Sequence, residues 1–303
     1  MLRLLIATDG SDDARAAQEF AASLPFPERP DVRLLAVTPC PVNLSEYAVV
    51  SVPYEQARHI QRTVVAPRVA EEAALLRPLV GSVTTELRIG DPANEVIAAA
   101  NDPPTDLIVM GASGLSAFST FLLGSVSDDV CRSTAHSVLV VRKTARKSTT
   151  DGQKPIPTPS RVLFAVDGSE ASNQAIDRLA SWSWTADARA LVVTAHHMIK
   201  VFGVSVYPDE ATRAAEQSKA DAIQQSAVGK LGKTFSHVHT SICDTDQIAR
   251  SIVDEAESWK ADLIVLGNRG LSGWKRFMLG STTLGVIRHA PCSVWVERLN
   301  RAT

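Results

Sequence analysis

The chain has 303 residues, of which 45% are hydrophobic and 21% are charged, and its formal net charge is −2 at pH 7. This length suits two domains of ordinary size, and the composition excludes a largely disordered chain. The near-neutral charge offers no basic field to nucleic acid or to an anionic membrane, and the apolar stretches are too short to span a bilayer. We therefore expect a cytoplasmic protein without nucleic-acid or membrane partners.

In the first half of the chain, short apolar runs alternate with longer Ala-rich amphipathic segments. The runs lie near residues 2–8, 31–38, 83–88, 106–110 and 137–142. Uninterrupted apolar strands are typical of a parallel sheet that is buried on both faces, with helices as crossovers. The segment 54–80 is a long predicted helix, and Pro67 predicts that it is kinked, broken or begun anew there.

The same alternation returns in the second half of the chain. Its apolar runs lie near residues 161–167, 188–196, 235–242, 262–267 and 292–297. No proline occurs between Pro208 and Pro291, so the helix equivalent to 54–80 should be straighter. Residues 143–160 are rich in Lys, Thr, Ser and Pro, which predicts an exposed linker.

The two halves repeat one another in sequence. LLIATDGS at 4–11 corresponds to VLFAVDGS at 162–169, and LIVMGASGLSAFSTFLLGS at 107–125 corresponds to LIVLGNRGLSGWKRFMLGS at 263–281. A duplicated unit determines the architecture. We predict two tandem α/β domains at 1–143 and 160–303, joined by a linker at 144–159. Each is a doubly wound, Rossmann-like, five-stranded parallel sheet with helices on both faces.

The residues after the first strand of each copy admit two interpretations. Asp9, Gly10 and Ser11, like Asp167 to Ser169 in the second copy, are ordinary turn and helix-capping residues. They also lie where a doubly wound sheet binds ligands, at the carboxyl end of a strand, where an aspartate can accept hydrogen bonds from a ribose.

A glycine pattern follows the fourth strand of each copy. Gly111, Gly114 and Gly124-Ser125 recur with the same spacing as Gly267, Gly270 and Gly280-Ser281. Glycines let backbone N–H groups turn toward a phosphate, and the following helix offers its positive N-terminal end. Ser125 and Ser281 are predicted to cap that helix while donating to the same anion.

These residues resemble the universal stress protein family, specifically the branch that carries the pattern G-x2-G-x9-G-[ST]. The resemblance covers 1–143 and 160–298 and implies an adenine nucleotide α-hydrolase-like fold that binds ATP, commonly with Mg²⁺ or Mn²⁺ held mainly by the phosphates. It implies contacts in the first copy at Ala7, Thr8, Asp9, Val37, Met110, Gly111, Ser113, Gly114, Gly124, Ser125, Val126 and Ser127. In the second copy it implies contacts at Ala165, Val166, Asp167, Leu266, Gly267, Arg269, Gly270, Gly280, Ser281, Thr282 and Thr283. The counterpart of Val37 is ambiguous between Thr194 and Ala195.

The copies differ in charge and in one turn. The loop of the second copy contains Arg269, Lys275 and Arg276, whereas residues 111–125 contain no basic residue. This difference favours triphosphate binding in the second copy, and a solvated loop is the alternative interpretation of Lys275 and Arg276. Cys243 stands where the first copy is predicted to have Gly90.

The leading function is an adenine-nucleotide-binding regulatory protein of the stress response, with no catalytic residues predicted. The absence of a P-loop and of a G-x-G-x-x-G motif argues against a dedicated enzyme. The alternatives are slow ATP hydrolysis, cyclic AMP binding and a nucleotide-free structural module. The resemblance also implies that the strands at 137–142 and 292–297 pair within the chain, through Val138, Leu139, Val140, Val294, Trp295 and Val296, and a homodimer is possible.

Two further residue types give no site. Cys40, Cys131, Cys243 and Cys292 are scattered without a C-x-x-C pair, which predicts buried free thiols in a reducing compartment. His237 and His239 alternate on a predicted strand, but no neighbouring ligands complete a metal set, so we predict no metal held by side chains.

Overall fold

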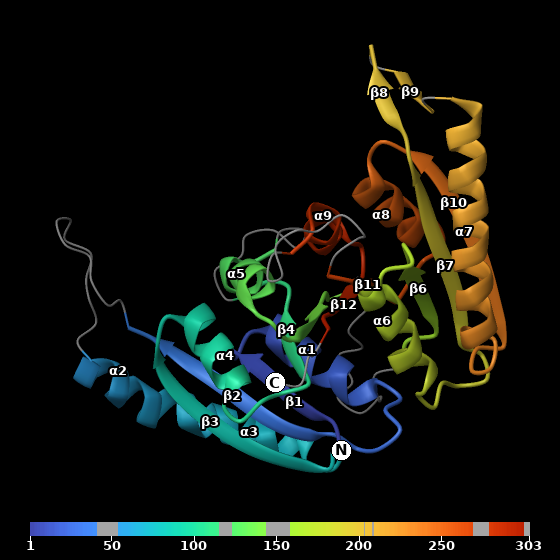
Figure 1. Cartoon of the computed structure of the whole chain (residues 1–303). Helices are drawn as coiled ribbons and strands as arrows, with labels where there is room; N and C mark the ends of the chain where they lie inside the picture. Colours follow the sequence, from blue (N-terminus) through green and yellow to red (C-terminus); the bar gives the residue numbers. More distant parts are fainter. Residues whose placement is uncertain are drawn as a thin grey trace. The chain divides into compact units, whose positions relative to one another are not determined.

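The computed structural model describes residues 1–40, 54–114, 123–143, 158–202, 204–207, 209–268 and 279–299 of the chain. The chain divides into two compact units, unit 1 from Met1 to Ile156 and unit 2 from Pro157 to Thr303. Each unit is an α/β domain with its own parallel strands (Figure 1). The predicted fold, two tandem doubly wound α/β domains, is therefore confirmed.

The described residues of unit 1 form five parallel strands in the order β5-β4-β1-β2-β3. Its elements are β1 (Arg3–Thr8), α1 (Asp12–Ser23), β2 (Asp31–Pro39), α2 (Tyr54–Ile60), η1 (Gln61–Val65), α3 (Ala66–Leu76), β3 (Ser82–Gly90), α4 (Pro92–Asn101), β4 (Leu107–Gly111), α5 (Ser125–Ser133) and β5 (Ser137–Val141). The strand order reverses between β1 and β4, so the carboxyl ends of these two strands form the mouth at which such sheets bind ligands.

Unit 2 repeats this arrangement in the order β12-β11-β6-β7-β10. Its elements are β6 (Arg161–Ala165), α6 (Glu170–Ala180), β7 (Arg189–His197), β8 (Ile199–Val201), β9 (Val204–Val206), α7 (Glu210–Leu231), β10 (His237–Thr245), α8 (Ile248–Ser258), β11 (Leu263–Gly267), α9 (Ser281–His289) and β12 (Ser293–Glu297). The antiparallel hairpin of β8 and β9 was not predicted, because each of its strands has only three residues.

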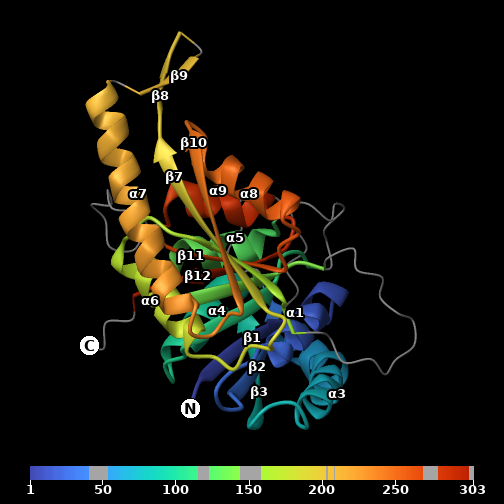
Figure 2. The ribbon, with the colours of Figure 1, turned by 90° about the vertical axis from the view of Figure 1, so that its right-hand side faces the viewer.

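Helices cover both faces of each sheet (Figure 2). In unit 1, α1 packs against α3, and α4 packs against α5; in unit 2, α6 packs against α7, and α8 packs against α9. The side-chain contacts agree with this division. Thr8 meets side chains of α1 and α3, whereas Arg88 meets a side chain of α4. The mouth of each sheet therefore has two different walls.

The helix that contains Pro67 is interrupted, as predicted. A π turn at Gln61–Val65 separates α2 from α3, and α3 begins at Ala66 with Pro67 in its first turn. The N–H of Ala66 donates to the carbonyl of Gln61 in this wider turn, which accommodates a residue that cannot donate. The corresponding helix α7 of unit 2 is continuous over 22 residues.

Trp295 belongs to the core of its own unit. It is fully buried and packs edge-on against Trp182, with ring centroids 5.4 Å apart, while its Nε1 donates to Glu297 Oε2 at 2.8 Å. The pairing of β5 with β12 stays a prediction. Among the helices of the described ranges, none has the length and apolar character needed to cross a bilayer.

Candidate functional site

The turn after the first strand has the same hydrogen bonds in both units. In unit 1, Asp9 Oδ1 accepts from the N–H of Ser11 at 3.0 Å, and Ser11 Oγ caps α1 by accepting from the N–H of Ala14 at 3.1 Å. Unit 2 repeats both bonds, at 3.0 and 3.2 Å. Gly10 has a φ of 76°, a conformation that favours glycine. The turn and capping roles are confirmed, and a ribose contact by the aspartates stays a prediction.

The glycine loop of unit 1 closely approaches this turn. A β-carbon on Gly114 would lie 2.6 Å from Asp9 Oδ2, and one on Gly111 would lie 2.8 Å from the carbonyl carbon of Asp13. Real β-carbons do not come so close, so the backbone contact at Gly111 requires glycine, whereas a β-carbon at Gly114 would force the Asp9 side chain to shift. Asp9, Gly111 and Gly114 therefore meet at the mouth of the sheet. Ser113, between the two glycines, is half-buried.

Helices α5 and α9 begin directly after the glycine loops, and neither has a side-chain cap. Their N-cap residues are Gly124 and Gly280. The prediction that Ser125 and Ser281 cap these helices is wrong, because both serines are the first residues inside the helix and both are exposed. Since first-turn N–H groups have no intrahelical acceptor, each helix presents an uncapped positive end.

Some polar groups of the loop are directed at protein instead. The N–H of Gly124 donates to the carbonyl of Ala112 at 2.7 Å, and the hydroxyl of Ser127 donates to the carbonyl of Gly111 at 2.8 Å. Unit 2 makes the same two bonds at 2.9 and 3.0 Å, the second from Thr283. These residues therefore hold the loop against the helix, while the first turns of α5 and α9 offer N–H donors that have no intrahelical acceptor.

The strands contribute an apolar floor to the mouth of unit 1, on the face that α4 and α5 cover. Ala7 pairs with Leu35, so Ala7 and Val37 share one face of the sheet. Both are half-buried, whereas Met110 is only 3% exposed and contributes its side chain to the core. Thr8, also buried, faces the opposite wall.

The floor of unit 2 is built in the same way. Ala165 pairs with Val193, which identifies Ala195 as the counterpart of Val37 and removes the ambiguity left by the sequence. Ala165 is half-buried, while Val166 and Leu266 are buried. The apolar floor of unit 2 therefore has the smaller side chain of Ala195 at the position where unit 1 has Val37.

The predicted correspondence between Cys243 and Gly90 is wrong. Gly90 is the last residue of β3 and pairs with Pro39, whereas Cys243 lies inside β10 and pairs with Ala195. In unit 1, the counterpart of Ala195 is Val37, and Val37 pairs with Arg88. Arg88 therefore occupies the position that Cys243 occupies in unit 2. Because β10 continues to Thr245, the turn before α8 contains no cysteine.

The residue beside the apolar floor is an arginine in unit 1 and a cysteine in unit 2. In unit 1, Arg88 Nε lies 2.5 Å from Glu86 and its Nη1 lies 3.3 Å from Glu95. Burial favours the neutral guanidine, but the two carboxylates outweigh it and raise the pKa of Arg88. In unit 2, burial and then Glu255 raise the pKa of Cys243 to about 11, which keeps this thiol protonated near neutral pH.

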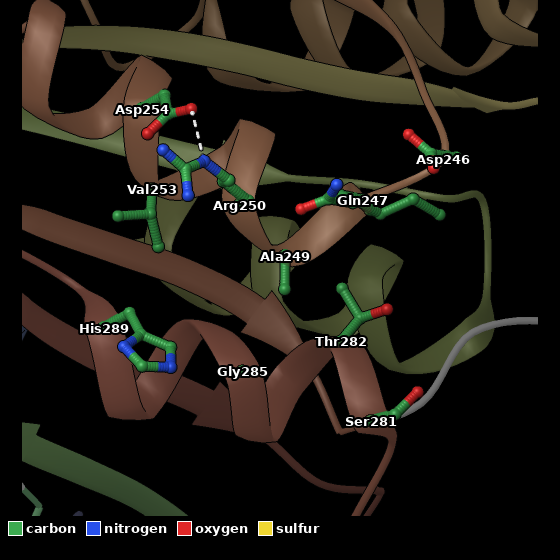
Figure 3. A pocket seen from close by; sticks show the side chains of 11 residues that line it. Asp246, Gln247, Ala249, Arg250, Val253, Asp254, Ser281, Thr282, Gly285 and His289 are labelled. Atoms are coloured by element: carbon green, nitrogen blue, oxygen red, sulfur yellow. Dashed lines mark ion pairs between the residues drawn. The ribbon is translucent and has the colours of Figure 1, made fainter. Parts of the chain in front are cut away.

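A cavity of about 650 Å³ lies between α8 and α9 of unit 2 (Figure 3). The first turns of both helices open into it, and α8 also has no side-chain cap. Its lining residues, which include two of the predicted contacts, are Asp246, Gln247, Ile248, Ala249, Arg250, Val253, Asp254, Ser281, Thr282, Gly285 and His289. Arg250, which is exposed and has its Nε 3.6 Å from Asp254 Oδ2, is a cation in the first turn of α8 that was not predicted from the sequence.

Several predictions fall elsewhere. Arg269, Gly270, Lys275 and Arg276 lie outside the described residues, so the predicted electrostatic advantage of unit 2 stays a prediction. Val126 lies in the first turn of α5 and is half-buried. In unit 2, Gly267 packs closely against α6, because a β-carbon on Gly267 would lie 3.0 Å from Ala171 Cβ. Within the described ranges, no three His, Cys, Asp or Glu side chains are grouped to hold a metal ion.

The profile of the family described as "Universal stress protein family" matches this chain twice, at residues 1–142 and 159–298. Universal stress protein Rv2623 of Mycobacterium tuberculosis is 30% identical over 222 residues, which cover 70% of this chain and 71% of that protein. Universal stress protein Rv2005c of the same organism is 27% identical over 243 residues, which cover 76% and 75% of the two chains.

Solved structures show the same fold. A universal stress protein from Archaeoglobus fulgidus is 20% identical, with a TM-score of 0.62 and 98% of both chains covered. A structure described as a putative universal stress protein from Pseudomonas aeruginosa is 17% identical, with a TM-score of 0.63, and the match covers 98% of this chain and 92% of that one.

Proposed function

The chain belongs to the universal stress protein family, and we propose that it is a cytoplasmic regulatory protein that binds an adenine nucleotide at the mouth of each unit. One observation carries this proposal. In both units an uncapped helix N-terminus follows a glycine loop at the carboxyl ends of the strands, and in unit 1 this loop lies directly against Asp9. Helix N-termini of this kind attract phosphate groups, because their N–H groups and dipole favour negative charge.

The remaining residues fit the other parts of a nucleotide. The half-buried floor of Ala7 and Val37, or of Ala165 and Ala195, offers an apolar surface for a base. The first turns of α5 and α9 offer N–H donors for phosphates, with Thr282 at the edge of the unit 2 cavity. ATP is the ligand we favour, with Mg²⁺ or Mn²⁺ coordinated mainly by its phosphates. Binding would act by shifting the population of conformations or partner-binding states.

Placing a carboxylate at each helix N-terminus tests the proposal. Ser125→Glu and Ser281→Glu put a negative charge beside the predicted phosphates, while an acidic first turn stabilises a helix by about 0.3–1 kcal/mol. We expect the double variant to lose ATP binding by calorimetry without losing stability. Ser133→Glu, at the other end of α5, is the matched control and should bind like the wild type.

The measurement also separates the alternatives. ATP binding by the double variant at wild-type affinity would contradict the phosphate assignment. Mass spectrometry of ligand released from the wild-type protein distinguishes ATP from cyclic AMP and from an empty structural module. Single-turnover assays with ATP, compared between wild type and the double variant, determine whether slow hydrolysis accompanies binding.

A further inference from the structure

The units also differ on the wall of the mouth that α3 forms in unit 1 and α7 forms in unit 2. Each of these helices lies beside the turn that follows the first strand of its unit. In unit 1, Arg68 Nη1 lies 3.7 Å from the position that a β-carbon on Gly10 would occupy. In unit 2, the atom at the equivalent place is Ile223 Cδ1, 3.0 Å from the corresponding position on Gly168. A cation in one unit is therefore replaced by an apolar side chain in the other.

The guanidinium of Arg68 has no partner within the part of the chain that the structure describes. Arg68 is exposed and makes no hydrogen bond or ion pair with any described residue. Some other arginines of unit 1 do have partners. Arg88 is held by two carboxylates, and Arg33 donates to the carbonyl of Ala99 at the end of α4. Arg68 is thus a cation beside the mouth whose charge is not neutralised by those residues.

The helix that carries Arg68 is anchored to the mouth. Glu72, one turn further along α3, accepts from the hydroxyl of Thr8 at 2.8 Å and from the amide of Gln18 at 2.6 Å. Arg68 and Glu72 are four residues apart and share one helix face, so these bonds hold the Arg68 backbone next to the turn. The ordering of a binding group before the ligand arrives lowers the entropic cost of binding.

The distribution of positive charge over the two copies is complementary. The loop of unit 1, residues 111–125, contains no basic residue, whereas the corresponding loop of unit 2 contains Arg269, Lys275 and Arg276. We propose that Arg68 is the phosphate-binding cation of unit 1 and takes the place of the loop cations of unit 2. This inference rests on the proposed nucleotide function and assigns a specific residue to the phosphates in unit 1.

The test uses the full chain with Gly270→Asp as background, which places a carboxylate in the loop of unit 2 so that binding reports unit 1. In this background we expect Arg68→Gln to weaken ATP about tenfold, since a charged hydrogen bond to phosphate is lost, and to leave adenosine binding unchanged. The salt dependence of ATP binding should also become weaker, and Arg68→Lys should recover part of the affinity. Arg77→Gln, with the same charge change at the far end of α3, about 14 Å along its axis, should bind as the background does.

Each outcome bears on the assignment. Equal ATP affinity of the Arg68→Gln and Arg77→Gln chains would overturn the role of Arg68 and leave the proposed function intact. A parallel loss of ATP and adenosine would show that Arg68 supports the fold instead of the phosphates. ATP binding by the wild type that disappears in the Gly270→Asp chain would place all binding in unit 2 and also overturn the inference. Absence of ATP binding in the wild type would remove the proposed function itself.

Discussion

Glu72→Ala should destabilise unit 1 by about 3 kcal/mol. The carboxylate accepts from Thr8 and Gln18, and the three side chains are buried, with exposed fractions of 9%, 7% and 3% for Glu72, Thr8 and Gln18. Each donor left without an acceptor costs about 1–3 kcal/mol. Gln18 still donates to the Thr8 hydroxyl at 3.3 Å, which places the expected loss in the lower half of the summed range of about 2–6 kcal/mol.

Unit 2 supplies the matched control. The positions that correspond to Thr8, Gln18 and Glu72 are taken by apolar residues, all buried: Val166, Ile176 and Ala227. Ala227 is assigned because it follows Ile223 by four residues, as Glu72 follows Arg68. Replacing every member of a buried polar group by apolar residues of similar shape is often nearly neutral. The triple variant Thr8→Val, Gln18→Ile and Glu72→Ala should therefore lose less stability than Glu72→Ala alone.

Urea unfolding followed by two signals can resolve these changes. All five tryptophans, at positions 182, 184, 259, 274 and 295, lie in unit 2, so fluorescence reports that unit, while far-UV circular dichroism reports both. The single variant should shift the dichroism midpoint of unit 1 well below that of the triple variant. A triple variant as unstable as Glu72→Ala would refute the reasoning, because lost hydrogen-bond acceptors would then not be the source of the cost.

Three further predictions concern Gly114, Tyr207 and Cys243. Gly114→Ala places a methyl group 2.6 Å from Asp9 Oδ2 and should lower the ATP affinity of unit 1 about tenfold by calorimetry, whereas unchanged affinity would contradict a role for this contact. Burial and the hydrogen bond to Asp244 raise the pKa of Tyr207 to about 12. The stability that Tyr207→Phe removes is therefore present below pH ~10 and lost as the pH rises toward 12. A difference in urea midpoint between wild type and variant that stays constant over this pH range would contradict the prediction. Cys243, with a pKa of about 11, should be alkylated at pH 8 about 100-fold more slowly than an ordinary thiol, and a rate like that of a free thiol would exclude the burial assigned to it.

Much of the architecture could be predicted from the sequence because it depends on local patterns that occur twice. The continuous apolar runs predicted the strands, and the break at Pro67 followed from a missing backbone donor. The cap of α5 was assigned one residue too late, to Ser125 and not Gly124. Sequence gives the order of residues at a helix start, whereas the cap is defined by backbone angles, which glycine and serine can both adopt.

Contacts between distant segments were not predictable in the same way. Arg88 and Cys243 correspond only because β3 and β10 have a defined register against their neighbours, and the turn sequences alone suggested a different alignment. The association of Glu72 with Thr8 joins residues 64 positions apart. A one-residue change of register would reverse the face on which such side chains lie, so pairing must be known before neighbours can be named.

The differences between the units concern the supports of the site more than the turns themselves. Asp9 and Asp167 make the same turn with the same bonds, yet the helix behind the turn is polar and carries a cation in unit 1 and is apolar at the same place in unit 2. Changes behind a turn can alter ligand affinity and unit stability without altering the groups that face the ligand. A duplicated chain can therefore retain two uncapped helix ends while placing the cation of each site on a different element, which is the arrangement that Arg68 would produce.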